Sequence, residues 1–166
     1  SAASDVYKRQ KIQRAAADAN TNNFDIRQVI ETLNCQDLAG QTVTLSFSAY
    51  NGANASFTAI NLQPWYSTAA NDGVNVAGSW VQLSAVSITT TTTVTRYSYS
   101  WAIPANALTV MFRIYSGAYS GTAGADDSLY LTNCQLELGN TPTPFEYRNF
   151  QQELAMCQRY YETSYD

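Results

Sequence analysis

The sequence predicts an all-β protein: a jelly-roll-like antiparallel β-sandwich with a short C-terminal α-helix. Of the 166 residues only 13% are charged, whereas 13% are aromatic, mostly tyrosine, and β-branched and aromatic side chains suit a half-buried pleated surface. About seven short segments, separated by turn residues, show the two-residue alternation of apolar and polar side chains that is typical of strands. The period changes to that of a helix only near the C-terminus.

The clearest strand is expected at residues 41–50. The side chains of Val43, Leu45, Phe47 and Ala49 face one way there, and mainly polar side chains face the other. The other expected strands are, in chain order, residues 24–31, 57–62, 80–83, 86–92, 94–101, 108–115 and 129–138.

Turn residues set the expected ends of these strands. Asn51-Gly52 ends the clearest one, since both residues tolerate positive φ. Pro64 is expected to close the strand before it, because proline has no N–H for the sheet ladder. The threonine run at residues 89–93 is interpreted as a solvated strand edge and not as a site.

The last expected strand has an irregular pattern. Its apolar side chains change phase, from Leu129 and Leu131 to Leu136 and Leu138. A β-bulge inserts one extra residue and so shifts the alternation by one. We therefore expect a bulge near residues 132–133.

The chain is expected to divide into three regions. Residues 1–10 contain a hexapeptide, Asp5 to Gln10, that matches the translated end of a transposon used for sequencing libraries. This region is interpreted as an artefact that replaces the true start of the domain. Residues 11–140 form the sandwich. Residues 141–166 hold a proline-containing linker and the C-terminal helix.

The helix is predicted from a repeat of large apolar side chains. Phe150, Leu154, Cys157 and Tyr161 recur at helical spacing, and Asn149 is suited to the N-cap. Such a face needs a surface to pack against, either on its own sandwich or on another subunit.

Composition excludes several classes of function. With no histidine, the chain has no Ser-His-Asp or Cys-His machinery and no His-ligated metal. A net charge of −4 with few charges makes nucleic acid and anionic membrane poor partners. No apolar run approaches the ~20 residues of a membrane span. Cys35, Cys134 and Cys157 form no Cys-x-x-Cys pair and are interpreted as small buried hydrophobes.

One C-terminal pattern is specific. Residues 135–139 read Gln-Leu-Glu-Leu-Gly, residues 143–148 read Thr-Pro-Phe-Glu-Tyr-Arg, and residues 157–162 read Cys-Gln-Arg-Tyr-Tyr-Glu. This pattern resembles a signature of bacteriophage tail-fibre and tail-appendage proteins, and weaker matches extend back to about residue 24. The resemblance implies a carbohydrate-binding-module-like jelly roll in a virion appendage that is assembled in the host cytoplasm.

The resemblance carries further expectations. Members of the family usually have additional strands before the segment that matches Phe24, so N-terminal strands are expected to be missing here. The full-length protein is expected to be a homotrimer. In carbohydrate-binding jelly rolls an aspartate at the start of the last strand often ligates a structural Ca²⁺, which makes Asp126 and Asp127 the candidates. Adjacent strand side chains point to opposite faces, so at most one of the two serves an inward site.

Four aromatic residues are candidates for sugar stacking: Trp65, Tyr66, Trp80 and Tyr119. Sugar rings present apolar C–H faces that pack on indole and phenol rings. The first two follow a proline in a loop-like stretch, and Tyr119 lies in a small-residue loop. Trp80 lies in a strand segment, where core or inter-subunit packing is the alternative, as it is for Trp101 and Tyr115.

The sequence thus favours a non-catalytic domain of a phage tail fibre or virion appendage, with a structural role or a role in binding host-surface polysaccharide. The alternative is a carbohydrate-binding module accessory to a secreted glycoside hydrolase, and a third possibility is a scaffold without a ligand. Catalysis is not expected, because the carboxylates form no motif of the kind that a glycosidase needs.

Overall fold

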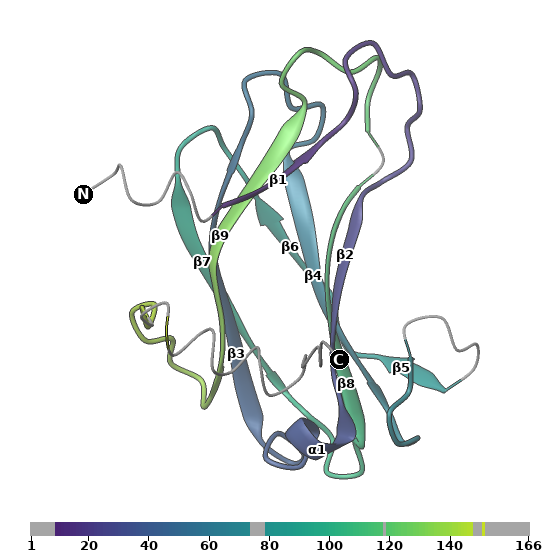
Figure 1. The fold of residues 1–166 in the computed structure, drawn as a ribbon, viewed down its shortest axis with the longest axis vertical. Coiled ribbons are helices and arrows are strands. Elements are labelled where there is room, and N and C mark those ends of the chain that lie inside the picture. The colour runs from purple at the N-terminus through teal and green to yellow at the C-terminus, as the bar shows by residue number, and fades with distance from the viewer. Residues whose placement is uncertain (1–8, 74–78, 118, 148–150, 152–166) are drawn as a thin grey trace, which may run out of the picture.

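A computed structural model describes residues 9–73, 79–117, 119–147 and 151, and within these ranges the protein is a two-sheet antiparallel sandwich (Figure 1). Sheet A has the strand order β1 (Gln10–Gln13), β9 (Ser128–Leu138), β3 (Thr42–Asn51) and β7 (Thr95–Ala102). Sheet B has the order β2 (Asp25–Ile30), β8 (Thr109–Ser116), β4 (Ala59–Ser67) and β5 (Trp80–Gln82), and β6 (Val86–Thr89) also pairs with β4.

The prediction of an all-β sandwich is confirmed. Apart from the β4–β5–β6 run, successive strands alternate between the two sheets, so the connections cross from sheet to sheet as in a jelly roll. The helix that the described ranges contain is α1 (Thr32–Cys35), a single turn at one end of the sandwich, and it is far too short to span a bilayer. The predicted C-terminal helix lies outside the described residues, as does Cys157.

The core forms between the two sheets, from the alternating side chains of the longest strands. Phe47 of β3, Ile60 and Leu62 of β4 and Leu129 of β9 are all fully buried. The predicted inward face of β3 is therefore confirmed. Thr44, on the opposite face of β3, is also buried, because its hydroxyl binds the backbone carbonyl of Gly139 at 2.7 Å. The chain after β9 thus covers part of the outer side of sheet A.

The expectation that Pro64 ends a strand is wrong, because β4 continues through it to Ser67. β4 pairs with β6 before this point and with β5 after it, so Pro64 lies opposite the gap between the two short strands. Its carbonyl still accepts a hydrogen bond from Leu83 N at 3.0 Å. On this side of β4 no single strand pairs along its whole length, and the missing N–H of Pro64 falls in the gap. An internal proline is tolerated at such a position.

The predicted bulge in β9 is confirmed. Thr132 pairs with Ser48 and Gln135 with Ser46, so two residues of β9 lie opposite one residue of β3. The first of them, Asn133, has a φ of +54°, a conformation that asparagine adopts more readily than most residues. The bulge gives β9 its phase change.

The cysteines differ in their surroundings. Cys35 is fully buried in the core cluster, as predicted, and burial raises the pKa of its thiol. Cys134 is exposed, so its interpretation as a buried hydrophobe is wrong. It lies in the bulge, where the local alternation of β9 is interrupted.

Candidate functional site

The outer side of sheet B gathers aromatic and polar side chains from five strands. In β4 the side chains of Ile60, Leu62 and Tyr66 pack toward the core, so the alternation turns those of residues 61, 63, 65 and 67 outward. The register then sets their neighbours on β2, β8, β5 and β6. We call this surface the β2–β5 face; its main side chains are Asp25, Arg27, Asn61, Gln63, Trp65, Trp80, Gln82, Met111, Arg113 and Tyr115.

Two of the predicted stacking residues meet on this face. Trp65 pairs with Gln82 across β4 and β5, and Trp80 pairs with Ser67, so the two indoles are diagonal neighbours. Both side chains are half-buried. Trp80 donates its indole N–H to the carbonyl of Gly73 at 3.0 Å. The sheet therefore brings together two residues that are fifteen positions apart in the sequence.

Trp65 has an unusual polar group. Its indole N–H is buried and has no hydrogen-bond partner among the described residues. A buried donor without a partner costs free energy in the folded protein. Met111 of β8 lies directly opposite Trp65 of β4, and its side chain is nearly fully buried.

Charged residues occupy the neighbouring rows of the face. Arg27 and Arg113 lie directly opposite each other on β2 and β8, an arrangement of like charges that destabilises a sheet. Asp25 binds both, at 2.7 Å from Arg27 Nη2 and 2.8 Å from Arg113 Nη2. The guanidinium of Arg113 also lies over the ring of Tyr115, 4.1 Å from its centre.

The Asp25 network predicts a dependence of stability on pH. Partial burial alone would raise the pKa of Asp25, but the hydrogen bonds from Arg27 and Arg113 outweigh it and hold the pKa below the ordinary 3.8. The resulting stabilisation is fully present above pH 3.8 and is lost as the pH falls through the lower folded-state value. Asp25→Asn should thus lower the free energy of unfolding by about 1 kcal/mol or less at pH 7, since the network is partly exposed.

Urea denaturation at several pH values measures this. The deficit of Asp25→Asn should shrink below pH 3.8. Asp37→Asn, at an exposed carboxylate outside the network, is the control and should have a small effect at pH 7. A deficit of Asp25→Asn that grows on acidification would contradict the assignment.

The structure corrects two of the predicted stacking residues. Tyr66 follows Trp65 in β4 and packs against the core on the opposite face. Tyr119 is 7% exposed and packs against the rings of Phe24 and Phe57, whose centres lie 6.4 and 5.7 Å from its own. Tyr119 is thus buried, and Tyr66 lies on the side of sheet B that faces the core. Both residues were expected in loops. Tyr66 instead lies in a strand, because β4 continues through Pro64.

The two remaining aromatic residues, Trp101 and Tyr115, lie on different sides: one in the core and one on the β2–β5 face. Trp101 is buried and donates its indole N–H to Ser84 O at 3.0 Å, which confirms its interpretation as a core residue. Tyr115 lies on the β2–β5 face and is half-buried. Tyr115 was given little weight because it lies in a strand segment, where core or inter-subunit packing was expected.

The two adjacent aspartates point to different surroundings, as expected. Asp126 accepts hydrogen bonds from Ser128 Oγ (2.7 Å) and Ala53 N (3.1 Å) and an ion pair from Lys11 Nζ (3.0 Å). The bond from Ser128 is the largest cause that holds the pKa of Asp126 well below its usual range, followed by the bond from Lys11. Asp127, in contrast, is 1% exposed.

Asp127 is bound by protein donors. It accepts bonds from Arg14 Nη1 at 2.9 Å, from Ser56 Oγ at 2.7 Å and from Ser56 N at 2.9 Å. Arg14 also donates to the backbone carbonyls of Asp18 (2.8 Å), Asn20 (2.6 Å) and Gly121 (3.2 Å). The carboxylate of Asp127 and three backbone carbonyls thus surround the buried guanidinium of Arg14. The guanidinium supplies the positive charge that faces this carboxylate.

These residues do not fit the predicted Ca²⁺ ion. Calcium takes six to eight oxygen ligands, but the oxygens around Asp127 already bind Arg14, and Asp126 is turned away from them. Within the described ranges no three Asp, Glu, Cys or His side chains gather where they could hold a metal ion.

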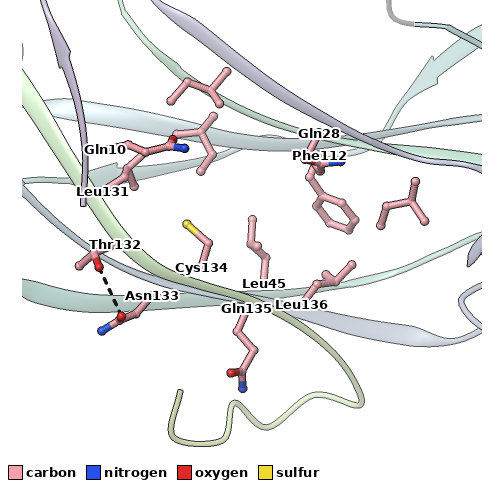
Figure 2. A pocket seen from close by; sticks show the side chains of 13 residues that line it. Gln10, Gln28, Leu45, Phe112, Leu131, Thr132, Asn133, Cys134, Gln135 and Leu136 are labelled. Atoms are coloured by element: carbon pink, nitrogen blue, oxygen red, sulfur yellow. Dashed lines mark hydrogen bonds between the residues drawn. The ribbon is translucent and has the colours of Figure 1, made fainter. Parts of the chain in front are cut away.

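A second feature is a groove on the open side of the sandwich (Figure 2). The short β1 pairs only with residues 128–131 of β9, so the rest of that edge has no neighbour there among the described strands. Between it and β2 lies an opening of about 480 Å³. Its apolar lining includes Ile26, Ile30, Leu45, Phe112 and Leu136. Figure 2 shows the Cys134 side chain turned into this opening and that of Gln135 turned away from it.

Comparisons with known proteins identify the fold. No family model and no curated protein matches the sequence. A solved structure titled "CBM4 structure and function" superposes with a TM-score of 0.55 at 17% identity, over 79% of this chain and 71% of that one. Weaker similarities include the enzymatically active domain of bacteriophage CBA120 tailspike protein 4 (TM-score 0.46, 12% identity, 79% of this chain and 18% of that one). Another is a family 16 carbohydrate-binding module (TM-score 0.43, 15% identity, 71% and 72%). The chain therefore has a carbohydrate-binding-module-like β-sandwich fold.

Proposed function

We propose that this protein is a non-catalytic module that binds a glycan through the β2–β5 face. One observation carries the proposal: Trp65, Trp80 and Tyr115 lie partly exposed on one side of sheet B, interleaved with amide and guanidinium groups. The carbohydrate-binding-module-like fold supports it, because such modules work by binding and not by chemistry.

The face offers both kinds of contact that a sugar needs. The rings of the three aromatic residues can pack on the C–H faces of pyranose units. Gln82, whose exposed side chain accepts a bond from the buried Gln63 at 3.1 Å, and the guanidinium of Arg113 provide donors and acceptors for hydroxyl groups. Because the surface is one face of a sheet, it suits an extended oligosaccharide, with one sugar unit packed on each aromatic side chain.

The reported structure with a TM-score above 0.5 is a carbohydrate-binding module. The role as an accessory module of a secreted glycoside hydrolase therefore has the stronger structural support.

A domain of a homotrimeric phage appendage, located in the virion, is the second candidate. It is favoured by the tail-fibre pattern at residues 135–148, part of which is held on sheet A: Glu137 accepts a bond from Thr143 N at 3.1 Å. Neighbouring genes would distinguish the two, since tail-assembly genes support the second role and a hydrolase reading frame the first.

A glycan array followed by affinity electrophoresis tests the binding function. We expect the wild-type chain to be retained by at least one polysaccharide. Trp80→Ala should weaken this binding by roughly 5- to 30-fold, the usual cost of one aromatic anchor. Tyr147→Ala, at an exposed aromatic side chain outside the β2–β5 face, should have no effect.

Two outcomes would contradict the proposal. If no glycan is retained, the chain is a scaffold. If a glycan is retained equally by Trp80→Ala and by the wild type, the binding surface lies elsewhere.

A further inference from the structure

The β2–β5 face differs in charge from the chain as a whole. Among its main side chains, two arginines, Arg27 and Arg113, stand against one carboxylate, Asp25, so the face carries a formal charge of +1. The whole chain carries −4. At physiological ionic strength, exposed charges more than about 8 Å apart are largely screened from each other. A ligand on this face therefore meets the local charge, which is positive.

The ion pairs with Asp25 leave part of each guanidinium for a ligand. Arg113 contacts Asp25 Oδ2 through Nε at 2.9 Å and through Nη2 at 2.8 Å. Arg27 contacts the same carboxylate through Nε at 3.2 Å and through Nη2 at 2.7 Å. In both arginines, Nη1 has no hydrogen-bond partner among the described residues. Two charged N–H groups thus remain for the oxygens of an anionic group.

The register places Arg113 between two of the aromatic side chains that are proposed to hold the glycan. Tyr115 lies two residues from Arg113 along β8, and Met111, which pairs with Trp65, lies two residues away in the other direction. Two residues of a strand span about 7 Å. A sugar chain that contacts both aromatic rings must therefore pass over the guanidinium of Arg113.

The other end of the face has the opposite charge. Asp72 accepts a hydrogen bond from Ser67 Oγ at 2.7 Å, and Ser67 pairs with Trp80. Glu31 directly follows β2 at this same end. On β4, Ser67 is four residues from the partner of Arg113, which is about 14 Å. An anionic group is thus favoured near Arg113 and not near Trp80.

We infer that the β2–β5 face takes an anionic glycan, whose carboxylate or sulfate group binds Arg113 between sugar units that pack on Tyr115 and Trp65. The inference rests on the glycan-binding function proposed above and adds the class of glycan. Uronic acid carboxylates and sulfate esters share the chemistry that a guanidinium recognises, which is a negative charge spread over several oxygens. The experiment separates these two sources.

Matched polysaccharides test the class of glycan. The array would carry neutral hydroxyethylcellulose beside polygalacturonate, alginate and chondroitin sulfate. We expect retention of at least one acidic polysaccharide, and binding about tenfold weaker or less after carboxyl reduction of a uronate or desulfation of a sulfate ester. Retention of neutral glycans alone, lost in Trp80→Ala, would overturn this inference and leave the glycan-binding function intact. Retention of no glycan would refute both.

Two substitutions with opposite effects on charge test the role of Arg113. Arg113→Gln should weaken binding of the retained acidic glycan by about tenfold. Asp25→Asn gives the face one more positive charge and should strengthen that binding by about threefold. Both variants break the same network, so a purely structural role would weaken binding in both, and that result would overturn the inference.

Arg96→Gln is the matched control for charge. It removes the same charge from an exposed arginine of sheet A, where Arg96 Nη2 donates to Ser46 Oγ at 2.7 Å. Because this charge lies on the other sheet and is screened by solvent, the affinity should stay within about twofold of the wild type. Equal losses in Arg96→Gln and Arg113→Gln would reduce the effect to net charge and would also overturn the assignment of Arg113.

Discussion

Replacing Arg14 by alanine is expected to lower the free energy of unfolding by about 3–5 kcal/mol, the range measured when one partner of a buried ion pair is removed. The side chains of Arg14 and Asp127 are 5% and 0% exposed. Without the guanidinium, Asp127 stays buried with only the donors of Ser56, and the carbonyls of Asp18 and Asn20 lose their donor. Each of these groups then carries a desolvation penalty that nothing offsets.

Urea denaturation at pH 7 measures the effect, and the chain offers a matched control. Lys11→Ala removes the partner of Asp126, the adjacent aspartate, at side chains that are 38% and 33% exposed. Its cost should be much smaller than that of Arg14→Ala, because an exposed ion pair is screened by solvent. Similar losses for the two variants would show that burial of the Arg14–Asp127 pair has no special weight.

The effect of Arg14 could not be predicted from the sequence. The residue lies in a polar stretch without periodicity, next to a strand of four residues, β1, that is too short to show an alternation. Its partner is 113 positions away. Only the pairing of β1 with β9 brings them together, and no local pattern encodes that pairing.

The longer strands were predictable because their information is local. β3 and β8 are ten and eight residues long, so the alternation of core side chains repeats often enough to exceed chance. The bulge in β9 was predictable for the same reason, since it appears as a change of phase inside a long strand. The sandwich thus follows from sequence pattern, and the short β5 and β6 lie within the strands expected at residues 80–83 and 86–92, whereas β1 was not expected.

The β2–β5 face was predictable only in part. The residue types were recognised, but Trp65 and Tyr66 are adjacent in β4 and point to opposite sides. Which of them is exposed depends on the strand's continuation past Pro64. Tyr115 joins the site because β8 pairs with β4, a contact between residues more than fifty positions apart.

Trp65→Ala is expected to weaken glycan binding by about 30-fold or more, because a central aromatic anchor contributes about 2 kcal/mol or more to a binding interface. Trp65 lies in the middle of the face, between Gln82 and Met111 in the register of the sheet. Isothermal titration with a glycan that the array identifies gives the dissociation constant. Trp101→Phe is the control, since Trp101 is a buried tryptophan of the core; it should lower the melting temperature and leave the affinity of the folded protein unchanged.

A second variant, Trp65→Phe, separates the ring from its polar group. It keeps an aromatic surface but deletes the buried N–H that lacks a partner in the described structure. Loss of an unsatisfied donor costs the free protein nothing and can stabilise it. If that N–H instead bonds a sugar oxygen in the complex, Trp65→Phe should bind about 5- to 10-fold more weakly while its stability is equal to or above that of the wild type. Equal affinity of Trp65→Phe and wild type would restrict Trp65 to stacking, and equal affinity of Trp65→Ala and wild type would remove it from the site, because a single indole supplies both contacts.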